Sequence, residues 1–127
     1  MKKYILLSLA ALFLCAFQPA AQAQTKQTVR FPKGSNTTTV TGKIVNGKQV
    51  IYFVNARKGQ SLEFDIAESE MNNDVVAEVF APDGRSLTRE DYGKEWRGNL
   101  PRNGVYKISV GTIESENADF KIRITIR

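Results

Sequence analysis

The sequence has no histidine and a single cysteine, Cys15, among its 127 residues. Without histidine the chain lacks both the usual general base at neutral pH and the commonest metal ligand. One cysteine cannot form an internal disulfide bond, and zinc sites built from cysteine and histidine are excluded. Any catalysis would have to use carboxylates or hydroxyls. The fold must be stabilised by an apolar core, without a cross-link.

The first 23 residues have the composition of a cleaved Sec signal peptide. Lys2 and Lys3 precede an apolar run over residues 4–17, and the small residues Ala21 and Ala23 suit signal peptidase. The run is shorter than the roughly 20 residues needed to span a bilayer. We therefore expect cleavage after Ala23 and a soluble periplasmic protein with no integral membrane segment.

Lipid attachment at Cys15 is the alternative processing route. Leu14 occupies the position before Cys15, where lipoprotein processing needs a small residue, so we expect Cys15 to be removed with the signal peptide. Of the 18 basic residues, Lys2 and Lys3 would be lost, which leaves 16 basic against 13 acidic residues. This modest positive charge is interspersed along the chain without a basic block, and we expect no binding to nucleic acid.

The remaining chain alternates short β-branched and aromatic runs with turn residues, a pattern typical of antiparallel sheets. We expect residues 24–28 to be a flexible N-terminus and residues 29–127 to form one domain. About eight strands in 100 residues predict an all-β, single-domain antiparallel sandwich of two sheets, jelly-roll-like in kind. The clearest expected strands cover residues 37–45, 49–56, 61–67, 74–81, 96–100, 105–111 and 120–127.

Asn46-Gly47 separates the first two of these strands. Both residues accept the positive φ angles of a type I′ turn, so the pattern predicts a β-hairpin. In the strand over 61–67, Leu62, Phe64 and Ile66 alternate with acidic residues, which predicts one buried and one solvated face.

Three segments carry a family resemblance. They read Gln-Val-Ile-Tyr-Phe-Val-Asn-Ala-Arg-Lys-Gly-Gln-Ser-Leu at 49–62, Val-Phe-Ala-Pro-Asp-Gly at 79–84 and Gly-Asn-Leu-Pro-Arg-Asn-Gly-Val-Tyr-Lys-Ile-Ser-Val at 98–110. Together they resemble the bacterial pre-peptidase C-terminal-like domain and the similar periplasmic inhibitors of g-type lysozyme. The resemblance covers about residues 29–127.

The resemblance implies a rigid sandwich that presents loops to the substrate cleft of a lysozyme, with polar and basic side chains in subsites meant for sugar. The motif residues themselves have structural explanations. Gly59 and Gly104 suit turns, Pro101 rigidifies one, and Leu62 and Tyr106 are expected in the core.

One loop interleaves aromatic and basic side chains, a composition typical of protein-binding hot spots and of sugar-stacking surfaces. Its residues are Arg89, Tyr92, Lys94, Trp96 and Arg97, and we predict that they bind the partner. The alternative for Trp96 is a core position, whereas we expect Tyr92 to be exposed.

We expect no enzyme activity, no cofactor and no metal. Glu63 and Asp65 alternate with core residues and belong to a solvated face, and the acids within 90–95 lie in a mixed-charge loop. Possible oxygen ligands for calcium match no EF-hand spacing, and turn chemistry explains them. These ligands are Asn72, Asn73, Asp74 and Asp83.

Two functions remain open. The leading hypothesis is an exported inhibitor of a lysozyme-type cell-wall hydrolase. The alternative is a glycan-binding or envelope-scaffolding module without inhibitory activity, in which the region from Tyr92 to Trp96 stacks on cell-wall glycan.

Overall fold

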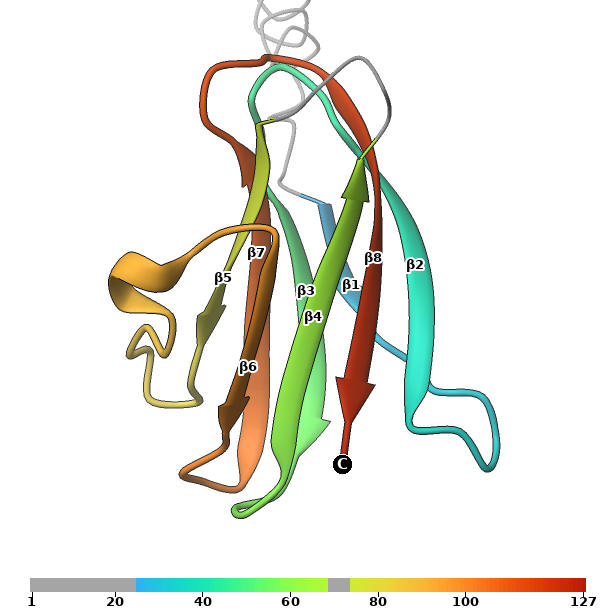
Figure 1. Cartoon of the computed structure of the whole chain (residues 1–127), viewed down its shortest axis with the longest axis vertical. Coiled ribbons are helices and arrows are strands. Elements are labelled where there is room, and N and C mark those ends of the chain that lie inside the picture. Colours follow the sequence, from blue (N-terminus) through green and yellow to red (C-terminus); the bar gives the residue numbers. More distant parts are fainter. Residues whose placement is uncertain (1–24, 69–73) are drawn as a thin grey trace, which may run out of the picture.

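The computed structural model describes residues 25–68 and 74–127. The predicted signal peptide and the loop at 69–73 lie outside these ranges. The described chain forms two four-stranded sheets packed face to face (Figure 1). The strands are β1 (Thr25–Thr28), β2 (Thr37–Ile44), β3 (Val50–Ala56), β4 (Ser61–Glu68), β5 (Val75–Phe80), β6 (Glu95–Asn99), β7 (Gly104–Thr112) and β8 (Ala118–Ile126).

Sheet A has the strand order β1-β3-β7-β5, and sheet B has the order β2-β8-β4-β6. The predicted all-β sandwich is therefore confirmed. All pairings are antiparallel except that of β1 with β3, which is parallel. Within the described ranges, no helix is long and apolar enough to cross a membrane.

The segment predicted to be flexible contains a strand. Residues 25–28 form β1, whose register on β3 runs from Thr25 opposite Val50 to Thr28 opposite Phe53. The N–H of Val29 extends the pairing by donating to the Phe53 carbonyl at 2.8 Å. All four side chains of β1 are exposed. Because β1 buries neither face, it has no apolar alternation from which the sequence could predict a strand.

The hairpin predicted at Asn46-Gly47 is wrong, although the turn is present. Both residues have positive φ, 54° and 69°, and the N–H of Lys48 donates to the Val45 carbonyl at 3.1 Å. However, β2 pairs with β8 and β3 pairs with β7. The turn reverses the chain direction as predicted, but it carries the chain from one sheet to the other.

Every connection between consecutive strands carries the chain from one sheet to the other. Strands with odd numbers belong to sheet A and strands with even numbers to sheet B, so consecutive strands are never neighbours in a sheet. Most of the connecting loops lie at the two ends of the sandwich, whereas the connection between β5 and β6 protrudes at its side, beside β5 (Figure 1).

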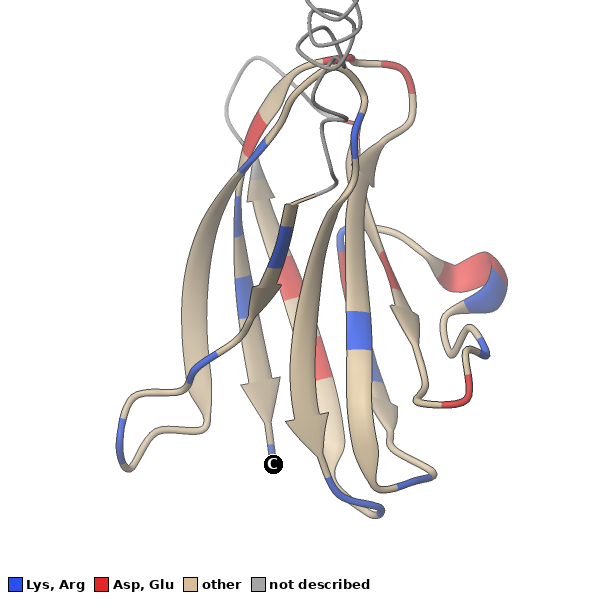
Figure 2. Ribbon diagram, turned by 180° about the vertical axis from the view of Figure 1, so that it is seen from behind, with Lys and Arg blue, Asp and Glu red and all other residues tan. Residues whose placement is uncertain are grey.

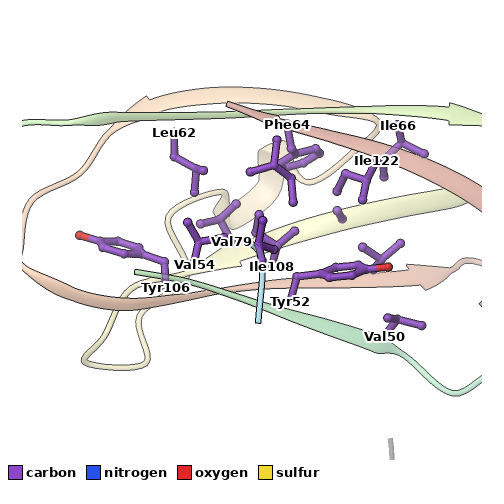
Figure 3. Packing of buried hydrophobic residues seen from close by; sticks show 14 of the residues in the cluster. Val50, Tyr52, Val54, Leu62, Phe64, Ile66, Val79, Tyr106, Ile108 and Ile122 are labelled. Carbon is purple, nitrogen blue, oxygen red and sulfur yellow. The ribbon is translucent and has the colours of Figure 1, made fainter. Parts of the chain in front are cut away.

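The core lies between the inner faces of the two sheets (Figure 3). From sheet B, Leu62, Phe64 and Ile66 point toward sheet A, as their alternation predicted. Tyr52 and Ile108 meet them from sheet A and are almost fully buried. Burial of each such side chain contributes about 1.5–3 kcal/mol to the free energy of unfolding.

The outer faces of the two sheets differ in chemistry. The outer face of sheet B is polar and includes two ion pairs, Arg123 with Asp65 at 3.1 Å and Lys43 with Asp119 at 3.8 Å. Glu63 and Asp65 of β4 thus lie on a solvated face, as predicted. The outer face of sheet A carries apolar side chains on all three of its longer strands. They are Ile51, Phe53, Val76, Phe80 and Val105.

Candidate functional site

Basic residues gather at one end of the sandwich (Figure 2). This basic end consists of the loop at 32–36, the turns at 57–60, 81–85 and 100–103, and the last residue. Its basic residues are Lys33, Arg57, Lys58, Arg85, Arg102 and Arg127. Asp83 is the only acidic side chain in these segments. It pairs with Arg102 at 3.3 Å and with Arg85 at 3.7 Å.

The other basic residues of this end have no carboxylate partner within the described parts of the chain. The opposite end, the acidic end, has four carboxylates on and beside the loop at 113–117, and it also carries Lys43 and Lys48. The carboxylates belong to Asp74, Glu114, Glu116 and Asp119. The molecule therefore has opposite charges at its two ends, and the basic end is suited to an acidic partner.

The turn at 57–60 is held in one conformation by hydrogen bonds within it. The N–H of Arg57 donates to Gln60 Oε1 at 2.7 Å, and the N–H of Gln60 donates to the Arg57 carbonyl at 3.2 Å. Gly59 has a φ of 91°, a left-handed conformation that glycine adopts without strain. The motif residues Gly59 and Gln60 thus determine how Arg57 and Lys58 are displayed.

The neighbouring turn at 100–103 clamps this turn from outside. The N–H of Lys58 donates to Asn103 Oδ1 at 2.8 Å, and the N–H of Gly59 donates to the Leu100 carbonyl at 3.0 Å. Leu100 returns a bond to the Gln60 carbonyl at 2.8 Å. The two turns form one rigid unit that loses little conformational entropy on binding.

Tyr106 anchors the second turn, although its side chain is fully buried. Its hydroxyl donates to the Arg102 carbonyl at 2.7 Å and accepts from the Arg102 N–H at 3.1 Å. A tyrosine that ties back to an upstream main-chain group in this way stabilises corners in other sandwiches. Arg102 is thereby held beside Arg57 and Lys58.

Removal of the Tyr106 hydroxyl tests this anchor. We expect Tyr106→Phe to lower the free energy of unfolding by about 1 kcal/mol, since both hydrogen bonds to Arg102 are lost. For a domain of this size the melting temperature should fall by about 4–8 °C. Tyr92→Phe is the matched control, because the Tyr92 hydroxyl has no partner among the described residues. An equal melting temperature for wild type and Tyr106→Phe would refute the anchor.

An open groove of about 410 Å³ lies beside the rigid turns. Arg57 and Gln60 line one part of it, and Ser35 and Asn36 of the preceding loop line another. Phe31 adds an aromatic wall. The basic end therefore combines positive charge with amide and hydroxyl groups that can donate hydrogen bonds.

The five residues predicted to bind the partner do not form a single surface. Trp96 points toward the interior, where its ring stacks on Phe64 with a centroid distance of 6.5 Å and an interplanar angle of 26°. A Cβ atom on Gly98 would lie 2.4 Å from the Trp96 ring, so the ring lies over that glycine. Trp96 therefore packs against the core, as the alternative interpretation of this residue expected.

The other four predicted residues are exposed. Arg89 begins the 3₁₀ helix η2 (Arg89–Asp91), and Tyr92 and Lys94 follow it at the edge of the sandwich. Arg97 lies on the outer face of sheet B, opposite Glu63 in the register. Tyr92 instead lines a groove on the outer face of sheet A. These residues therefore face different directions.

Asp74 organises the acidic end. Its carboxylate accepts hydrogen bonds from the N–H groups of Ser115 at 2.6 Å and Glu114 at 2.8 Å, and from the Ser115 hydroxyl at 2.9 Å. The bonds from the Ser115 and Glu114 main chain lower the pKa of Asp74. Asp83 lies at the opposite end, so the two aspartates cannot share an ion.

Asp74→Asn should lower the melting temperature at neutral pH, because the amide accepts these bonds without a charge. A depressed pKa in the folded state stabilises the protein above the ordinary pKa of aspartate, and this stability is lost as the pH falls through the folded-state value. The difference in melting temperature between wild type and Asp74→Asn should therefore shrink toward acid pH. A difference that is independent of pH would contradict this role.

No family model and no curated protein sequence matches the chain. Among solved structures, PliG of Aeromonas hydrophila, a periplasmic lysozyme inhibitor of g-type lysozyme, superimposes with a TM-score of 0.71 at 22% identity. The match covers 81% of this chain and 96% of that protein. The chain has the PliG fold.

Two further structures support this assignment. PliG of Salmonella Typhimurium matches with a TM-score of 0.66 at 26% identity, over 83% of this chain and all of that protein. The pre-peptidase C-terminal domain of Bacillus anthracis collagenase matches with a TM-score of 0.56 at 12% identity, over 84% and 99% of the two chains. Both families suggested by the sequence motifs are thus structural neighbours.

The basic end of this PliG-like fold could not be predicted from local sequence composition. Its basic residues are scattered between positions 33 and 127, and no window of the sequence contains a basic block. The sequence contained one indirect indication of the basic end: Arg57, Lys58 and Arg102 lie within the motifs that carry the family resemblance. Within residues 25–68 and 74–127, no three acidic, cysteine or histidine residues are placed to hold a metal ion.

Proposed function

We propose that this protein is a periplasmic inhibitor of a lysozyme-type cell-wall hydrolase and that it acts by binding, without catalysis of its own. The observation that carries the proposal is the fold shared with two PliG inhibitors over 96% and 100% of their length. The signal-peptide pattern of residues 1–23 supports export to the compartment in which such an inhibitor would act.

The basic end is the face that we assign to the enzyme cleft. Glycoside hydrolases generally use two carboxylates that flank the scissile bond, so their clefts favour positive charge. Arg57 and Lys58 have no ion-pair partner in the described chain and are displayed on a rigid turn. Complementary charge and a preorganised surface favour fast and specific association.

The loop that the sequence predicted is the competing face. Arg89, Tyr92, Lys94 and Arg97 are exposed, but three carboxylates within 90–95 balance their charge. An acidic cleft would attract this mixed surface less than it attracts the basic end. Among these four residues, Tyr92 has the largest apolar surface available to a protein partner.

The test is the lysis of cell-wall suspensions by g-, c- and i-type lysozymes, followed by turbidity. The protein is exported with its own signal peptide, purified and added in molar excess. We expect inhibition of one type and a 1:1 complex with that enzyme. Unchanged lysis by all three types would refute the proposal. The N-terminal sequence of the purified protein should begin at Gln24 if cleavage follows Ala23.

Glycan binding is the second candidate function. It is favoured by the groove beside Tyr92 on sheet A, which lies outside the basic end. The two functions can be separated because an inhibitor binds the enzyme in the absence of polysaccharide, whereas a glycan-binding module binds the polysaccharide alone.

A further inference from the structure

The outer face of sheet A contains an open groove of about 280 Å³ near the edge strand β5. Tyr92 and Ile113 line it, and they are 53% and 65% exposed. Val76 adds an apolar surface from β5, and the Gln49 side chain lies over Gly111 of β7, where an added Cβ would be 3.4 Å from Gln49 Cγ. The groove is therefore apolar in part and accessible from solvent.

Main-chain hydrogen bonds preform this groove. Gly93 follows Tyr92 and exchanges two bonds with Ala77 of β5, at 2.8 and 3.2 Å. The N–H of Ile113 donates to the Asp74 carbonyl at 3.1 Å. The Tyr92 wall is thus tied through Gly93 to the middle of β5, and the Ile113 wall is tied to Asp74, the residue that precedes β5. A ligand would enter a site whose backbone is already in place.

Besides Tyr92, four polar side chains line the groove: Gln49, Glu78, Ser109 and Thr112. The Thr112 hydroxyl already donates to the Ser115 carbonyl. Ser86 Oγ donates to Glu78 Oε1 at 2.8 Å, which orients the carboxylate and leaves Oε2 without a partner among the described residues. The Gln49 amide and the Ser109 hydroxyl have no hydrogen-bond partner within residues 25–68 and 74–127. The groove therefore offers donors and acceptors beside an aromatic ring.

We propose that this groove binds one pyranose ring of an uncharged glycan. An aromatic side chain accepts the C–H face of a sugar, while carboxylate, amide and hydroxyl groups bond its hydroxyls. The Glu78 carboxylate selects against anionic sugars by charge repulsion. The site is separate from the basic end, so the proposal does not depend on lysozyme inhibition.

The experiment is a titration of the ¹⁵N-labelled protein with tetra-N-acetylchitotetraose, followed by amide chemical shifts. We expect saturable shifts at residues 76–78, 92–93 and 109–113. Tyr92→Ala should weaken binding by about tenfold, since the aromatic contact is lost. Val105→Ala is the matched control, because Val105 is 48% exposed on the same sheet face but does not line the groove.

Two further measurements test the chemistry of recognition. Glu78→Gln should weaken binding severalfold, because a neutral amide is a poorer acceptor than a carboxylate. Tetragalacturonate, an anionic control glycan, should leave the groove amides of the wild-type protein unshifted. The proposal is overturned if chitotetraose gives no saturable shifts, if its shifts map to the basic end, or if Tyr92→Ala binds as tightly as wild type.

Discussion

Reversal of charge at Arg57 and Lys58 together is expected to weaken lysozyme inhibition by about 100-fold or more, as when charged partners at an interface are replaced by repulsive ones. The main chain that carries the two side chains is clamped by Asn103 and Leu100, so the turn cannot easily withdraw from an acidic cleft. The measurement is the inhibition constant of the Arg57→Glu/Lys58→Glu protein in the turbidity assay. For the wild type, inhibition should also weaken as salt increases.

The matched control is Lys107→Glu/Lys121→Glu. It changes the net charge by the same amount, but Lys107 and Lys121 lie on the broad outer faces of sheets A and B. This control should inhibit nearly as well as wild type. Equal losses in both double variants would mean that overall charge, rather than the basic end, governs binding. Unchanged inhibition by Arg57→Glu/Lys58→Glu would exclude the basic end as the inhibiting face.

Gly42→Ala is expected to lower the free energy of unfolding by about 1–3 kcal/mol, the range for overpacked cores. Gly42 pairs with Phe120 across β2 and β8. An added Cβ would lie 2.3 Å from Phe120 Cζ and 2.6 Å from the Tyr52 hydroxyl oxygen. Both rings are buried and packed edge to face, so neither can withdraw without disturbing the core.

Thermal or urea unfolding measures this effect, with Thr41→Ala as the control. Thr41 precedes Gly42 in β2 but is exposed on the outer face. Introducing alanine there should change the free energy of unfolding very little. Phe120→Leu in the Gly42→Ala background should recover part of the loss by making room for the methyl group. Stability close to wild type in Gly42→Ala would show that the rings can shift.

The sequence predicted strand positions and their inner faces well, because a strand with one buried face has a period of two. Leu62, Phe64 and Ile66 are an example. Pairing partners were not predictable in the same way. Asn46-Gly47 determines a local reversal, but the choice of a neighbour depends on apolar surfaces contributed by β7 and β8, far along the chain.

The candidate site was harder to predict than the fold for a related reason. Sequence composition groups residues that are close along the chain, and it selected the segment from Arg89 to Arg97. Alternation within β6 then sends Trp96 inward and Arg97 outward, which divides the group. The basic end is formed by the opposite process, since separate loops contribute one or two basic residues each and meet only in three dimensions.

Because consecutive strands always belong to different sheets, folding of this domain should be slow. No two strands that adjoin along the chain pair with each other, so every ladder closes a loop that contains at least one whole strand. Folding rates fall as the sequence separation of contacts rises, and we expect a time constant of milliseconds to seconds. β8 lies between β2 and β4, so sheet B cannot be completed before β8 has been synthesised and has paired. Until then β2 remains an unpaired edge, which is the period when the chain is most exposed to aggregation.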